Sequence, residues 1–267
     1  MKHAGERPSG ARVRVRGFAM ALLLNGFLLV ALAFVALGDT SSTSTPSPGD
    51  TEAPASREGA GAEPVDCATM LAATIQAHYE TVNDFSADFE QQTKSVTLAS
   101  ASLGDDALST GTVVFSKPGK MRWQYLAPTP SQVISNGSVL WIFDSVAREA
   151  QRLPVTEGYL TGAALEFLIG DGEILEDFDV TAASCEPNAR NAVQLKLLPK
   201  QAAGYESLSL EAASDTGEIY VTSLVDLFGN ETRISFKNTK TNLAPDATHF
   251  DFEVPADVRV FDMVVEP

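Results

Sequence analysis

Histidine and cysteine, the residues that most often bind transition metals, are scarce in this sequence. Its 267 residues include three histidines and two cysteines. His3 lies near the N-terminus, and His78 and His249 are too far apart to form an HxxxH or HExxH pair. No CxxC or Cys/His spacing occurs either. We therefore expect no metal site.

Short motifs of common catalytic and nucleotide sites are also missing. The sequence has no GxSxG elbow, no GxGxxG and no GxxxxGK[ST]. An acidic run of Asp171, Glu173, Glu176, Asp177 and Asp179 does not fit the spacing of an EF-hand loop and is interpreted as a solvated face. Paired catalytic carboxylates stay open, because their separation depends on the fold. We expect a protein that is not an enzyme and has no cofactor.

Basic residues are outnumbered. The chain has 19 Lys and Arg against 35 Asp and Glu, for a net charge of −16 at pH 7. Several of the basic residues precede the first apolar run, so the remainder is more acidic still. A surface of this sign repels nucleic-acid phosphates and anionic lipid headgroups. We therefore expect no nucleic-acid partner and no polybasic docking to membranes.

One long apolar run lies near the N-terminus, at residues 18–37 (FAMALLLNGFLLVALAFVAL). Basic residues precede it and small polar residues follow it, which is typical of a secretory signal. At about 20 residues, such a run is also long enough to cross a bilayer as a helix. Residues 1–38 are interpreted as either a cleaved signal peptide or a retained N-terminal anchor. In both cases the rest of the chain is exported.

A region of different composition follows. Residues 39–64 are rich in Ser, Thr, Pro, Gly and Ala and lack large apolar side chains, which predicts a flexible linker. Residues 65–267 then form the expected folded domain. In an exported chain, the pair Cys67 and Cys185 suggests one disulfide. Two separate buried thiols are the alternative.

Apolar periodicity predicts that the domain opens with a helix. Residues 67–82 have helical spacing, and Asp66 is a suitable N-cap. Residues 156–177 are interpreted as a second helical segment with a loop, in which Leu165 and Leu168 have helical spacing.

Between and after these segments, short apolar runs alternate with turn signals. Asn136-Gly137 separates two such runs and predicts a hairpin, and Gly229-Asn230 predicts another turn. The region 249–262 is expected to form the final strand and a tail. About ten antiparallel strands with few helices predict a strongly curved antiparallel sheet or incomplete β-barrel, with helices over its open mouth.

The most specific stretch is residues 111–144 (GTVVFSKPGKMRWQYLAPTPSQVISNGSVLWIFD). It contains a Gly, an apolar strand, a basic residue before Pro, a Trp, another Pro, then Ser-Asn-Gly and a strand with Trp. The residues in register are Gly111, Lys117, Pro118, Met121, Trp123, Pro128, Ser135, Asn136, Gly137, Leu140 and Trp141. Together with VNDFSADFEQ upstream, and SLVDLFGNETRISFKN and FDFEVPADVRVFD downstream, this pattern resembles the LolA family over roughly residues 67–262.

The resemblance implies an eleven-stranded incomplete barrel closed by a helical lid, with an apolar cavity for acyl chains. Alternation along the strands predicts that Met121, Trp123 and Tyr125 share one face, Phe85 and Phe89 another, and Val113 and Phe115 a third. The expected lipid-binding residues are Tyr79, Phe85, Phe89, Val113, Phe115, Met121, Trp123, Tyr125, Val133, Leu165 and Leu168. Simple filling of a core is the alternative for each of them.

One position departs from the family pattern. Family members carry an Arg before the motif Pro that holds the lid shut, and Lys117 occupies this place here. Lys lacks the planar fork of Arg, so the latch is expected to be weaker or differently arranged, and a solvated Lys at a strand end is the alternative.

In function, the resemblance implies a monomeric periplasmic chaperone for acylated lipoproteins. It would take its cargo from an inner-membrane Lol ABC transporter and pass it to the outer membrane, through a receptor if one is present. A lipid-sensing regulatory module and a membrane-tethered general lipid carrier of the same fold are the alternatives. An outer-membrane receptor of this fold would need a lipidated Cys after the signal, and the sequence has none there.

Overall fold

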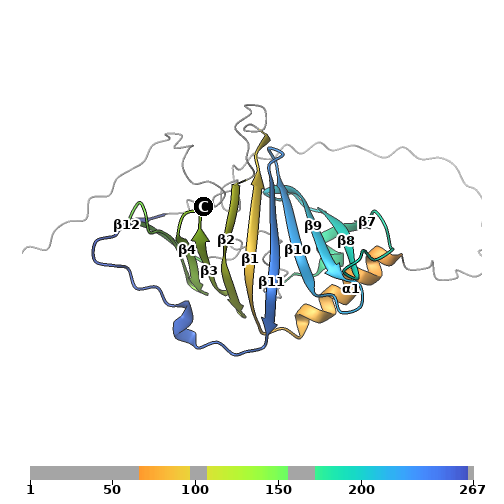
Figure 1. Ribbon diagram of the computed structural model, residues 1–267, viewed down its shortest axis with the longest axis horizontal. Helices are drawn as coiled ribbons and strands as arrows, with labels where there is room; N and C mark the ends of the chain where they lie inside the picture. Colours follow the sequence, from red (N-terminus) through yellow and green to blue (C-terminus); the bar gives the residue numbers. More distant parts are fainter. Residues whose placement is uncertain (1–65, 97–106, 156–171, 264–267) are drawn as a thin grey trace, which may run out of the picture.

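A computed structural model describes residues 66–96, 107–155 and 172–263 of the chain (Figure 1). These residues form mainly β-structure with few helices. Among them, no helix has both the length and the apolar character needed to cross a membrane. The expected signal or anchor (1–38) and the expected linker (39–64) lie outside the described residues.

Helix α1 (Cys67–Glu80) begins where the sequence predicts. The Asp66 carboxylate accepts a hydrogen bond from the backbone N–H of Thr69 at 2.9 Å, which satisfies one of the free donors at the helix start. This hydrogen bond also lowers the pKa of the Asp66 carboxyl, because it favours the charged form. The helix buries the apolar side formed by Ala68, Leu71, Ala72, Ile75 and Tyr79. It is therefore part of the core and lies beside β7 at one end of the sheet (Figure 1).

Twelve strands follow within the described residues. They are β1 (Asp84–Lys94), β2 (Ala107–Ser116), β3 (Lys120–Ala127), β4 (Ser131–Asn136), β5 (Val139–Asp144), β6 (Glu149–Pro154), β7 (Phe178–Ala182), β8 (Ala192–Pro199), β9 (Tyr205–Ala213), β10 (Ile219–Asp226), β11 (Glu231–Thr241) and β12 (Arg259–Asp262). A short helix, α4 (Ile174–Asp177), precedes β7. The predicted hairpin at Asn136-Gly137 joins β4 to β5, and the predicted turn at Gly229-Asn230 joins β10 to β11.

All twelve strands belong to one sheet, in the order β12-β6-β5-β4-β3-β2-β1-β11-β10-β9-β8-β7. The two ends of this order do not pair, so the sheet is open and curved, as Figure 1 shows. This confirms the predicted fold class. Two details differ from the expectation: β12 adds a twelfth strand, and it pairs with β6 in parallel, whereas every other pair is antiparallel.

The end of the chain also differs from the final strand and tail expected over residues 249–262. A short 3₁₀ helix, η1 (Ala247–Phe250), comes first, and the Asp246 carboxylate caps it by accepting from the backbone N–H of Thr248 at 2.9 Å. Extended chain containing Pro255 separates η1 from β12, and Pro has no N–H to donate to a sheet. Within this region, the strand therefore forms only at its end, where Arg259–Asp262 pair with β6.

The two faces of the sheet have different coverings. We call the face that carries Phe89 and contacts α1 the inner face. On the other, outer face, residues 247–258 cross β3, β4 and β5 before β12 joins the edge of the sheet beside β6, and we call residues 243–263 the C-terminal strap. Phe252 of the strap packs on Trp141 and Phe143, with ring centroids 5.4 Å apart in each pair. Arg122 of β3 fixes the strap by donating to the backbone oxygens of His249 (2.7 Å) and Asp251 (3.0 Å).

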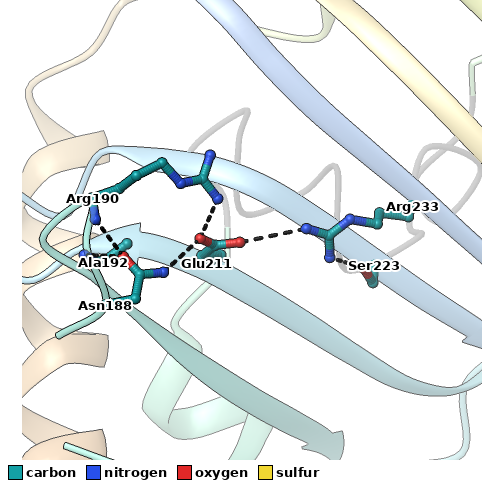
Figure 2. A network of polar contacts seen from close by, with 6 residues as sticks. All are labelled: Asn188, Arg190, Ala192, Glu211, Ser223 and Arg233. Atoms are coloured by element: carbon teal, nitrogen blue, oxygen red, sulfur yellow. Dashed lines mark hydrogen bonds and ion pairs between the residues drawn. The ribbon is translucent and has the colours of Figure 1, made fainter. Parts of the chain in front are cut away.

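Farther along the outer face, a polar network joins β9 to its neighbours (Figure 2). The Glu211 carboxylate accepts hydrogen bonds from Arg190 at 2.5 Å, from Asn188 at 3.0 Å and from Arg233 at 3.5 Å. Arg233 of β11 also reaches the Ser223 hydroxyl of β10 at 3.5 Å. The outer face here carries polar contacts, whereas Leu208 and Leu210 of β9 point inward into the apolar core.

Candidate functional site

Aromatic side chains of β1, β2, β3 and β11 meet on the inner face. The Phe89 ring lies edge-on to those of Trp123 and Tyr125, with centroids 4.9 Å away in each case. Phe115 packs on Trp123 at 5.6 Å, and Phe85 packs on Phe236 at 5.5 Å. Such edge-to-face pairs are favourable beyond the area that they bury. The result is a continuous aromatic surface.

This surface corrects the expectation of three separate faces. The strands are paired so that Ala87 lies opposite Val113, Val113 opposite Trp123, and Trp123 opposite Val133. Because opposite residues in a sheet point to the same side, all these side chains share the inner face. Alternation within one strand cannot reveal this, since it does not tell how neighbouring strands are aligned.

Glycine at position 111 makes this packing possible. A Cβ atom there would lie 2.0 Å from the Gln124 carbonyl oxygen and 2.8 Å from the Phe89 ring. No side chain fits at this distance, so Phe89 can lie across β2 only because residue 111 has none. This gives a physical reason for the first Gly of the motif.

The aromatic surface ends in a polar pair. The Tyr125 hydroxyl donates to the Gln91 side-chain oxygen at 2.8 Å, and both residues are buried. Burial raises the pKa of the Tyr125 phenol, so it stays neutral and keeps its proton for this bond. An otherwise apolar face thus carries a satisfied polar group where β1 approaches its end.

Helix α1 lies at the end of the inner face opposite Tyr125 and Gln91. Several contacts attach the helix to other segments. A disulfide joins Cys67, at the start of the helix, to Cys185 in the connection after β7. Midway, Gln76 accepts a hydrogen bond from the backbone N–H of Ile174 at 3.3 Å. The Tyr79 hydroxyl accepts from the buried backbone N–H of Ile219 at 3.2 Å.

Lys117 provides a further attachment from the other half of the sheet. Its ammonium group donates to the backbone oxygen of Tyr79, in the last turn of α1, at 2.7 Å. This is the position at which the resemblance implies a lid latch. A Lys therefore reaches the helix from the end of β2, where its own backbone N–H donates to the Asn83 oxygen at 2.9 Å.

The structure places nine of the expected lipid-binding residues together. Tyr79, Phe85, Phe89, Val113, Phe115, Met121, Trp123, Tyr125 and Val133 all belong to one buried apolar cluster. Leu165 and Leu168 lie outside the described residues. Within the described part of the chain, no group of three or more His, Cys, Asp or Glu could hold a metal ion.

The lipid-binding residues predicted from the sequence do not include the other half of the inner face. The same cluster continues through β8, β9, β10 and β11, with Leu195, Leu197, Leu208, Leu210, Ile219 and Phe236 buried and Leu224 and Ile234 partly buried. The signal was present, because AVQLKLLPK and SLSLEAA alternate apolar and polar residues. Together the two halves make a broad apolar surface suited to a flexible apolar ligand.

Comparison with known proteins places this architecture in a family. The family model described as "Outer membrane lipoprotein carrier protein LolA" matches residues 80–253. An outer-membrane lipoprotein carrier protein of Methylococcus capsulatus is 32% identical over 160 residues, which is 58% of this chain and 72% of that protein. A carrier of the same name from Chromobacterium violaceum is 28% identical over 197 residues, covering 70% of this chain and 85% of that one.

Among solved structures, a LolA superfamily protein of Nitrosomonas europaea is 12% identical, with a TM-score of 0.38, and the match covers 69% of this chain and 97% of that one. The family match covers well over half of the chain and includes the strands that carry the aromatic surface. This chain therefore belongs to the LolA family of outer membrane lipoprotein carrier proteins.

Proposed function

We propose that this protein is a monomeric periplasmic chaperone that shields the acyl chains of lipoproteins against its inner face. It receives acylated lipoproteins from an inner-membrane Lol ABC transporter and passes them to the outer membrane, through a receptor where one is present. The observation that carries the proposal is the continuous apolar inner face, rich in aromatic rings at its centre and bounded by α1.

The chemistry of the cargo explains why such a face is needed. Each CH₂ group of an acyl chain costs about 0.8 kcal/mol when it is left in water. A lipoprotein therefore does not leave a bilayer for the aqueous periplasm unless another apolar surface covers its chains. Aromatic side chains and the thioether of Met121 offer a surface that adapts to chains of different length. Partly buried Leu224 and Ile234, at the edge of the cluster, are the residues from which a chain could spread inward.

Two neighbouring residues of β11 allow a matched test of the inner face. Ile234 points inward, packs on the cluster and is half-buried, whereas Ser235 is also half-buried but points outward. Glutamate at position 234 would place a charge on the acyl-binding face, and glutamate at position 235 would not. Comparing Ile234→Glu with Ser235→Glu thus separates loss of the face from a general effect of added charge.

The experiment uses the exported protein with its N-terminus as the cell leaves it. It is mixed with inner-membrane vesicles that contain a labelled acylated lipoprotein, and the soluble fraction is analysed by native mass spectrometry. We expect a soluble one-to-one complex with the parent and with Ser235→Glu, and a loss of at least about tenfold with Ile234→Glu. Circular dichroism checks that both variants are folded.

Other outcomes would contradict the proposal. Bound phospholipid without lipoprotein release would favour a general lipid carrier or a lipid sensor. Equal release by the two variants would place the acyl chains elsewhere than on the inner face. Neither lipid nor lipoprotein in the complex would mean that the chain has the fold without the carrier function.

A further inference from the structure

Exposed large apolar side chains are unevenly distributed over the sheet. We call the end at which β1, β3, β5, β8 and β10 finish the distal rim, because it lies opposite Lys117 and the last turn of α1. Of the thirteen exposed large apolar residues among those described, eight lie at this rim: Val96, Leu108, Leu126, Val146, Leu175, Leu198, Leu227 and Phe228. At the opposite rim, the described residues include two such side chains, Met70 of α1 and Leu243.

Two of the three most exposed side chains of the eight stand on one hydrogen-bonded turn. Leu227 and Phe228 lie between β10 and β11 and are 59% and 77% exposed. Beneath them the carboxylate of Asp226, itself 2% exposed, accepts from the backbone N–H groups of Phe228 and Asn230 at 2.8 Å each. It also accepts from the Asn230 side chain at 2.8 Å. The turn therefore presents two apolar side chains on a backbone that these hydrogen bonds hold in place.

A second turn of the rim is built in the same way. Val146, between β5 and β6, is 70% exposed. One oxygen of the Asp144 carboxylate accepts from the backbone N–H groups of Val146 and Ala147 at 2.8 Å each. Ser145 ties this turn to the start of β4 by donating to the Pro130 oxygen at 2.6 Å. Asp226 and Asp144 thus each hold a turn whose tip carries exposed apolar side chains, and both turns lie at the same end of the sheet.

The charges along the rim do not favour an anionic partner. Lys94 pairs with Glu231 at 3.8 Å, and Arg148 pairs with Asp257. Lys200 donates to the Leu175 backbone oxygen at 2.8 Å, beside the exposed acidic residues of α4. These cations already have partners, so they add little attraction between the rim and anionic lipid headgroups.

We propose that the distal rim docks on a phospholipid bilayer by inserting its apolar tips, led by Leu227 and Phe228, into the interfacial region. A stable protein interface needs a contiguous buried patch of about 1,000 Å² or more, whereas these side chains lie on separate turns, on strand ends and on the short helix α4, spread along the rim from β5 to β8. A bilayer accepts separate side chains, because fluid lipid needs no complementary shape.

This docking goes beyond carriage, since a carrier can bind acyl chains without touching a membrane. It would bring the end of the inner face near Tyr125 and Gln91 close to the lipid. An acyl chain could then pass between the bilayer and the inner face with little exposure to water. That last step rests on the proposed function, but the docking itself does not.

The test places a local probe on each rim of the exported protein, again with its N-terminus as the cell leaves it. Phe228→Trp reports on the distal rim, and Leu243→Trp, at a position that is 60% exposed, is the matched probe on the opposite rim. The emission of the native Trp123 and Trp141 is subtracted with the parent protein. Each variant is mixed with phosphatidylcholine vesicles that contain brominated acyl chains, which quench only an indole in contact with them.

We expect a blue shift and strong quenching for Phe228→Trp and neither for Leu243→Trp. Adding phosphatidylglycerol to the vesicles should leave the quenching unchanged or weaken it. Phe228→Asp should lower the vesicle partition coefficient of the parent by about tenfold, with no such effect from Leu243→Asp.

Absent or equal quenching of the two probes would overturn the proposal, and so would binding that requires anionic lipid. A shift of the Phe228→Trp emission with solubilised inner-membrane proteins but not with vesicles would identify a protein partner instead. The release assay with Ile234→Glu is independent of these measurements, so failure of docking and failure of carriage can be distinguished.

Discussion

The ammonium group of Lys117 donates a hydrogen bond of 2.7 Å to the backbone oxygen of Tyr79, and this contact ties the end of β2 to the last turn of α1. The carbonyl groups of a final helical turn have no partner within the helix, and the negative end of the helix dipole favours a cation there. The side chain of Tyr79 meanwhile contacts Ile219 in the other half of the sheet. One residue of α1 is thus held from both halves.

Removing the Lys117 ammonium group should loosen α1. We expect Lys117→Met to lower the free energy of unfolding by about 1 kcal/mol and to speed amide hydrogen exchange in the last turn of α1. Lys117→Arg should restore most of the protection, because it keeps a cationic donor. Lys120→Met, three residues away, is the control for loss of a charge. Unchanged exchange in Lys117→Met would show that this contact does not hold the helix.

Gly217 should tolerate no side chain, because α1 passes directly over it. Its φ is +76°, and a Cβ atom would lie 2.7 Å from the Thr74 oxygen and 2.8 Å from the Ile75 Cα. We expect Gly217→Ala to destabilise the fold by at least about 2 kcal/mol in urea unfolding. Gly204→Ala, which meets nothing within 4 Å, should change stability by less than about 0.5 kcal/mol. Similar losses for both variants would refute this account of the α1 contact.

The disulfide should stabilise the protein chiefly through the unfolded chain. It links residues 118 positions apart, and a loop of that length corresponds to about 4–5 kcal/mol in the chain-entropy model. We expect the double variant Cys67→Ala/Cys185→Ala to lose up to this amount in urea unfolding under non-reducing conditions. Reducing agent should shift the parent toward the variant and leave the variant unchanged. If reducing agent does not change the urea unfolding of the parent protein, Cys67 and Cys185 are not joined by a disulfide.

His249 should make the C-terminal strap sensitive to acid. Partial burial, and then the positive charge of Arg122, hold the pKa of this imidazole below its ordinary value of 6.5. The unfolded chain therefore binds a proton more readily than the folded one. The contribution of His249 to the free energy of unfolding should be complete above about pH 6.5. It should decrease as the pH drops from there toward the lower pKa of the folded state. His249→Gln should remove this part of the dependence in urea unfolding between about pH 8 and about pH 5. An acid loss in the variant as large as that of the parent would contradict the assignment.

Local patterns sufficed for much of the fold. Asp66 before an apolar stripe predicted the start of α1, and Asn136-Gly137 between two apolar runs predicted the β4–β5 hairpin. These signals are local: a cap satisfies donors three residues away, and a tight turn depends on two residues that can adopt its backbone angles. The motif of residues 111–144 predicted the family for the same reason, since its residues lie close together in the chain.

Interactions between distant segments could not be predicted from local sequence patterns. The parallel pairing of β12 with β6 depends on the path of the C-terminal strap across the outer face, and no periodicity within residues 249–262 encodes that path. The same holds for the inner face. Alternation within each strand predicted three separate sets of side chains, and the strand register joins these sets into one face.

The sequence by itself determined which residues are apolar and how they alternate along each strand, because both follow from side-chain chemistry and the two-residue repeat of a strand. Only the tertiary structure decided that these strands align into a single inner face, that Lys117 meets Tyr79, and that the exposed apolar side chains gather at one rim. The physical reason is that strand register and strand order are fixed by packing among segments far apart in the chain, and no local preference specifies them.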